Sequence, residues 1–307
     1  MTTQQIIESK INQVIAILQQ YKKKPDPQVL FKADLRGVLF SIEGILRLHL
    51  KTNNIKFKYH QELAQKSLAK LKELEDLLGL YSLYDDIEKF AKENHLKPIK
   101  RKYTQIQLEE YIFTNWIIPH YKSLKDPFAR TFELTPIYKL QIDLLKINFP
   151  ENSNKNIKQM LSQEIKRVNK KNKALKQDIL KDKTSIKNLE EGFHEWRRAI
   201  RWVSIYIQSY RDQFYLNPEK KLGRKEKEMY LKNKNNPFTQ LSKDKKQIQL
   251  NKTQFLILSE YIQRLGEAKE MAEYSLYLNA PGIYSVKTAH HLYQDFMKTR
   301  CLNKLLL

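Results

Sequence analysis

The sequence predicts an all-α protein, and three observations support that prediction. Only seven glycines occur in 307 residues, whereas Leu, Ile, Lys, Glu and Gln, which favour helices, are abundant. Apolar residues recur every three or four positions over long stretches, as on the buried face of a helix. Hydrophobic residues make up 41% of the chain, which is enough for a substantial core.

The first half is expected to form four helical segments, at 4–22, 29–51, 60–94 and 104–122. Each has an apolar stripe at helical spacing, and Pro25 and Pro27 separate the first segment from the second. The following stretch, 123–153, holds three prolines around a short apolar segment and is interpreted as a connector with one short helix. We therefore divide the chain into halves, 1–150 and 151–307, that together form one domain.

The second half begins with a long regular pattern at 155–190 whose apolar residues fall on one side of a helix. Lys166, Lys170 and Lys173 fall on the opposite side. Further helices are expected from 193 to about 215, at 253–278 and at 285–304, while 217–252 lacks periodicity and is interpreted mostly as loop.

Charge is the strongest compositional signal. Lys and Arg number 56 against 34 Asp and Glu, a formal charge of +22, and windows 155–187 and 220–252 each contain 11 basic and 3 acidic residues. Such a field favours a polyanionic partner. Cys301 is the only cysteine, which excludes an internal disulfide and a Cys-rich zinc site. Without a signal-peptide pattern or a bilayer-spanning apolar run, the expected location is the cytoplasm.

The segment FHEWRRAIRW, residues 193–202, concentrates cations on one helix. Helical steps of 100° place Trp196, Ile200 and Val203 on one side. They place four cationic side chains within a sector of about 100° on the other: His194, Arg197, Arg198 and Arg201. No Ser, Cys or carboxylate lies at a spacing that would make the histidine part of a nucleophilic triad. Two interpretations remain open. The cationic face could bind phosphate groups, or its arginines could pair with acidic residues of a neighbouring helix.

These residues resemble the conserved histidine α-helical domain (CHAD) family. Its members carry, twice per chain, a helix with the pattern H-x-x-R-(K/R)-x-x-(K/R) and a later L-G-x-x-(R/N)-D segment. The four cationic residues above fill the first pattern position by position. The second is matched by Leu265, Gly266 and Lys269, with Glu270 in place of Asp.

The first half resembles the pattern only in part. Ala33 takes the histidine position, Arg36 is retained, and Arg47 lies further along the same face. Leu78 and Gly79 match the later segment, whose acids are displaced to Asp85 and Asp86. The resemblance therefore implies that the C-terminal half carries most of the binding.

The resemblance implies two pseudo-symmetric antiparallel helical bundles that face a basic central cleft and bind inorganic polyphosphate. No set of residues in the sequence suggests catalysis, so the expected function is binding alone. No cofactor and no metal ligand set is expected, and the sequence carries no signal for an oligomeric state. The expected binding residues are His194, Arg197, Arg198, Arg201, Arg36, Arg47, Lys166, Lys170 and Lys173.

Three alternatives remain. An RNA-binding helical protein could stack bases on Tyr215, Tyr230 or Phe238. A polyphosphate- or triphosphate-processing enzyme would need an E-x-E-x-K motif, which Glu226-Lys227-Glu228 matches only in its first three positions. A basic amphipathic helix at 155–190 could instead lie on anionic lipid.

Overall fold

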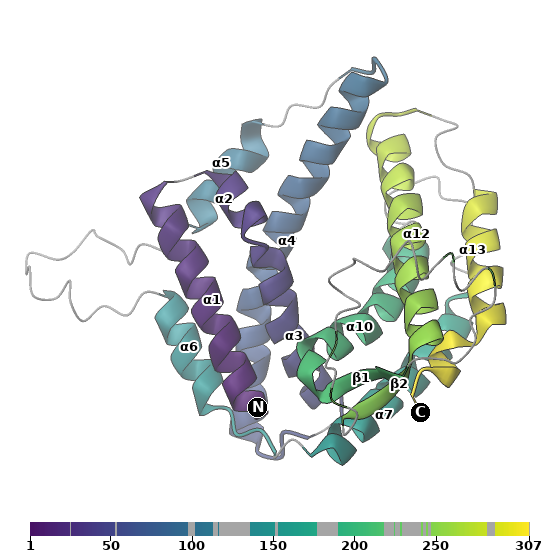
Figure 1. The fold of residues 1–307 in the computed structure, drawn as a ribbon. Coiled ribbons are helices and arrows are strands. Elements are labelled where there is room, and N and C mark those ends of the chain that lie inside the picture. The colour runs from purple at the N-terminus through teal and green to yellow at the C-terminus, as the bar shows by residue number, and fades with distance from the viewer. Residues whose placement is uncertain are drawn as a thin grey trace, which may run out of the picture. The chain divides into compact units, whose positions relative to one another are not determined.

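The structure is a computed structural model that describes residues 1–24, 26–52, 54–97, 102–112, 116, 136–150, 153–176, 190–217, 224, 228, 241, 244, 247–280 and 286–306. These residues form ten α-helices and one two-stranded sheet (Figure 1). The all-α expectation is confirmed. The chain divides into two compact units, Met1–Glu151 and Asn152–Leu307. None of the described helices is long and apolar enough to cross a membrane.

The first unit is built around three long helices that run side by side (Figure 1). These are α1 (Thr3–Lys23), α3 (Leu35–Lys51) and α4 (Lys58–Glu93), joined by the shorter α2 (Pro27–Lys32), α5 (Lys102–Ile112) and α6 (Pro136–Lys146). Helix α3 packs against both α1 and α4, and α6 packs against the same two helices. Fully buried aliphatic side chains fill the space between them, among them Ile11, Leu39 and Leu71.

The predicted single helix at 29–51 is wrong, because the chain breaks it between α2 and α3. Asp34 adopts a left-handed backbone with φ of 51° and accepts a 3.2 Å hydrogen bond from the Gly37 amide as the N-cap of α3. A Cβ on Gly37 would lie 2.2 Å from an Asp34 oxygen, so only glycine leaves room for this cap. Ala33, expected inside the helix, is instead the residue that ends α2.

The second unit centres on α10 (Glu195–Ser209), which packs against α7 (Asn154–Ala174) and α12 (Lys252–Tyr277). A π-helical turn, Glu190–His194, leads directly into α10. Helix α13 (Val286–Thr299) lies beside α12 (Figure 1), and a 3₁₀ turn, Cys301–Lys304, follows it. Trp196 is fully buried and stacks edge-on against Phe193, Tyr293 and Phe296, so aromatic packing ties α10 to α13.

The helix expected to continue to about 215 ends earlier, and a short parallel sheet joins the residues that follow it to the end of the region expected to be loop. Helix α10 ends at Ser209, and after the 3₁₀ turn Arg211–Gln213 the chain forms β1 (Phe214–Asn217). This strand pairs in parallel with β2 (Ile248–Asn251), which leads straight into α12. Each strand has only four residues, the shortest length at which alternation indicates a strand, so the sequence signal is weak.

Candidate functional site

Helix α10 has the two-sided character that helical geometry predicts. Trp196, Ile200 and Val203 are completely buried. The side chains on the other face are half-buried, except Arg198, which is exposed. That face holds His194, Arg197, Arg198 and Arg201. His194 is the last residue of the π-helical turn and not part of the regular helix.

Arg198 is held by a carboxylate from its own helix. Its Nη1 lies 2.7 Å from Glu195 Oε1, and the other oxygen of Glu195 lies 2.6 Å from Lys171 Nζ of α7. Burial alone would raise the pKa of Glu195, but Lys171 and Arg198 outweigh burial and hold that pKa below its usual value. The acid-paired reading of the arginines therefore holds for Arg198, and Glu195 is a site residue that sequence reasoning missed.

Arg197 packs on the glycine of the matching L-G segment. A Cβ built on Gly266 of α12 would lie 3.1 Å from Arg197 Nη2, so the absence of a side chain lets the guanidinium approach the helix. Leu265 beside it is fully buried. Lys269 forms an ion pair with the buried Glu273, one turn further along α12, and Glu270 is exposed.

The first unit repeats this contact with Arg36 and Gly79. A Cβ on Gly79 of α4 would lie only 2.5 Å from Arg36 Nη2. Arg36 also donates a 2.8 Å hydrogen bond from Nε to Glu75 and lies over the Phe40 ring, 5.4 Å from its centroid. The arginine is thus held by a glycine and a carboxylate of α4 and by an aromatic ring of its own helix, α3.

Arg47 is also paired within the first unit. Its Nη2 lies 2.6 Å from Glu43, one turn earlier on α3, and the Glu43 side chain is only 3% exposed. Burial raises the pKa of Glu43, and the adjacent Arg47 opposes that shift. Both arginines predicted to bind in this unit are therefore neutralised by buried carboxylates.

The lysines of α7 differ from the arginines in exposure and pairing. Lys166, Lys170 and Lys173 are exposed, as is Lys155 at the start of the helix. None of the four forms an ion pair with any residue in the part of the chain that the structure describes. At 100° per residue they fall within a sector of about 60°, and at 1.5 Å per residue they extend over about 27 Å. We call these four residues the lysine stripe.

The residues named for a metal site, for base stacking and for triphosphate chemistry do not form a site among the described residues. Among the described residues, no cluster of three His, Cys, Asp or Glu side chains could hold a metal ion. Tyr230, Phe238, Glu226 and Lys227 lie outside the described residues, and Tyr215 is half-buried on β1.

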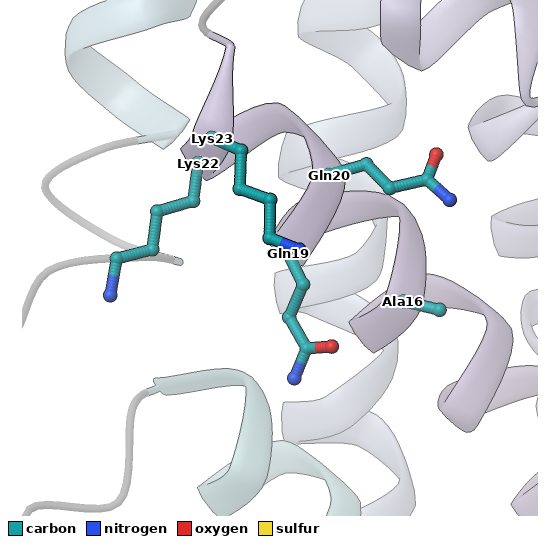
Figure 2. A pocket seen from close by; sticks show the side chains of 5 residues that line it. All are labelled: Ala16, Gln19, Gln20, Lys22 and Lys23. Atoms are coloured by element: carbon teal, nitrogen blue, oxygen red, sulfur yellow. The ribbon is translucent and has the colours of Figure 1, made fainter.

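A hollow lies beside the C-terminal end of α1, and the side chains that line it all project from that helix (Figure 2). They are Ala16, Gln19, Gln20, Lys22 and Lys23. The glutamines and lysines can donate hydrogen bonds, but the lining contains no carboxylate, histidine or hydroxyl group that could activate a water molecule for hydrolysis.

Comparison with known proteins adds no assignment. No protein-family model, curated protein or solved structure matches the chain.

Proposed function

We propose that the protein binds inorganic polyphosphate through its C-terminal unit and does not turn it over. The observation that carries this proposal is the lysine stripe on α7. Lys166, Lys170 and Lys173 follow one another at i,i+4 and i,i+3 spacing and repel one another. Lys155 extends the same face, and no described carboxylate pairs with any of the four. A linear polyanion along the helix would relieve that repulsion and release its own condensed counterions.

The α10 face supports the same proposal through a different contact. Guanidinium groups bind phosphate oxygens in a bidentate manner, and Lys171 and Glu195 connect α10 to α7 within one unit. A phosphate that reaches Arg198 competes with Glu195 for the guanidinium. We infer that the lysine stripe provides the long-range attraction and that the arginines provide directional contacts.

The resemblance to the CHAD family supplies the ligand, and one repeated contact supports the resemblance. In each unit the arginine of the first motif lies against the glycine of the second, Arg36 on Gly79 and Arg197 on Gly266. The N-terminal copy contributes less to binding in this proposal, because Glu75 and Glu43 already pair with Arg36 and Arg47.

Competition between ligand classes tests the proposal. Long-chain polyphosphate, tripolyphosphate, single-stranded RNA and anionic vesicles are titrated at two salt concentrations. Long polyphosphate is expected to bind most tightly and to lose most affinity with salt. Equal affinity for RNA would overturn the choice of ligand, and phosphate release from polyphosphate, with or without magnesium, would show an enzyme.

Matched lysine variants locate the binding. Lys166→Ala with Lys170→Ala and Lys173→Ala is expected to weaken polyphosphate binding strongly. The control changes three exposed lysines of α4 that, within the described residues, also form no ion pair, and it removes the same charge: Lys66→Ala, Lys70→Ala and Lys92→Ala. Arg197→Ala with Arg201→Ala is expected to weaken binding as well. Equal losses in the two lysine triples would contradict a specific role for α7.

A further inference from the structure

The start of α4 presents two aromatic side chains to solvent between two lysines. Phe57 is 63% exposed and Tyr59 is 60% exposed, and among the other large hydrophobic residues that the structure describes only Met1 is comparably exposed. Lys56 and Lys58 are exposed beside them, and the Lys58 side chain is 89% exposed. The order is therefore Lys-Phe-Lys-Tyr, on an element separate from those that form the proposed polyphosphate site.

The two rings are neighbours because both pack on the same imidazole. The Phe57 and Tyr59 centroids lie 5.9 Å and 5.3 Å from that of His60, with interplanar angles of 77° and 65°. Edge-on packing uses only part of each ring. The exposed fractions of the two residues leave most of their surface accessible for a further contact.

The segment that carries the rings is anchored to the protein. Ile55 is 1% exposed, and the Gln61 side chain donates a 2.6 Å hydrogen bond to the Ile55 carbonyl across the start of the helix. Phe57 is the N-cap of α4, and its carbonyl accepts the first helical hydrogen bond, from Gln61 N. A surface fixed before binding loses little conformational entropy when a ligand arrives.

We propose that this surface binds single-stranded nucleic acid, with bases stacked on Phe57 and Tyr59 and phosphates near Lys56 and Lys58. Alternating cations and exposed rings match a strand that alternates phosphates and bases. A membrane fits less well, because the exposed face that continues along α4 is polar, with Glu62, Gln65 and Lys66.

The test uses the full-length protein and fluorescently labelled oligonucleotides. Phe57→Ala with Tyr59→Ala is expected to weaken binding of an oligouridylate by at least about fivefold per ring. An abasic oligonucleotide of the same length keeps the phosphates but has no bases, so its affinity is expected to be low and unchanged by the variant. Polyphosphate affinity is also expected to be unchanged, which separates this site from the proposed function.

Two controls make the result specific. Ile106→Ala with Leu145→Ala removes two other exposed apolar side chains of the same unit and is expected to leave oligonucleotide binding intact. The exchange Phe57→Tyr with Tyr59→Phe keeps both rings and is expected to retain binding.

The proposal is overturned if the alanine variant binds the oligouridylate like the unmodified protein. It is also overturned if the abasic strand binds as tightly as the oligouridylate. Loss of binding to anionic vesicles with unchanged oligonucleotide binding would identify a lipid surface instead.

Discussion

Substitution of Gly79 by alanine should have opposite effects on stability with and without Arg36. The new Cβ would lie 2.5 Å from Arg36 Nη2 and 3.0 Å from its Cζ, so the guanidinium must move away from α4. We expect that movement to disrupt the 2.8 Å contact between Arg36 Nε and Glu75, whose carboxylate is buried. A hydrogen bond to a charged group contributes about 1.5–3 kcal/mol, and the exposure of Arg36 places this one near the lower end.

Alanine also gains about 1 kcal/mol of helix propensity over glycine. In the unmodified protein the two effects oppose each other, and we expect Gly79→Ala to be destabilising by about 0.5–1 kcal/mol. In the Arg36→Ala background nothing is left to displace, so the same substitution should be stabilising by about 1 kcal/mol. The expected coupling energy is therefore about 1.5–2 kcal/mol.

Chemical denaturation of the four proteins measures this cycle as differences in unfolding free energy. The equivalent cycle with Gly266→Ala and Arg197→Ala should show the same sign with a smaller coupling, because the Cβ would lie 3.1 Å from Arg197. If Gly79→Ala changes stability equally in both backgrounds, Arg36 does not lie on Gly79, and the repeated contact that supports the family resemblance is lost.

Two further predictions concern ionisable groups. Glu195→Gln removes the anion that pairs with Arg198 and Lys171, so polyphosphate affinity should rise by about two- to fivefold. Titration at low salt measures this change. Unchanged or weaker binding would contradict competition between Glu195 and phosphate at Arg198. His49 is fully buried against Phe149, and burial lowers its pKa from 6.5 to about 4. As pH falls, His49 is protonated in the unfolded chain before it is protonated in the folded protein. The unfolding free energy of the unmodified protein, relative to that of His49→Leu, should therefore fall as pH drops from 6.5 towards 4, by up to about 1.4 kcal/mol per pH unit. A difference in unfolding free energy that stays constant with pH would contradict the burial of a neutral imidazole.

Helical periodicity predicted the long elements well. Helices α1 and α12 begin and end within a residue or two of the expected positions, because their apolar stripes are regular and their caps, Thr2 and Asn251, are good ones. Periodicity could not reveal the break at Asp34, since the apolar pattern continues through it and the break depends on one side chain that caps a backbone amide. Periodicity also could not predict the sheet. The pairing of β1 with β2 joins residues about thirty positions apart, and no local pattern specifies such a partner.

The sequence predicted which face of α10 carries the cationic side chains, but not all of the acids with which the arginines pair. The two-sided character of α10 follows from 100° steps, and Trp196 is buried accordingly. The pairs Arg47–Glu43 and Arg198–Glu195 lie within one helix at i,i+4 and i,i+3 spacing, which the sequence itself contains. The pair Arg36–Glu75 spans 39 residues and needs the tertiary fold. The aromatic pair at Phe57 and Tyr59 also escaped sequence reasoning, because in sequence an exposed ring and a buried ring look alike. The Lys-Phe-Lys-Tyr order was the one available signal.

The salt dependence of polyphosphate binding tests the central claim most directly. The logarithm of the association constant for long-chain polyphosphate is measured against the logarithm of salt concentration for the unmodified protein and for the Lys166, Lys170 and Lys173 alanine triple. If each lysine displaces counterions as on a single-stranded polyanion, the slope should become shallower by about 2. The Lys66, Lys70 and Lys92 triple should keep the original slope. An unchanged slope in the α7 triple, or an equal change in both triples, would contradict binding along the lysine stripe.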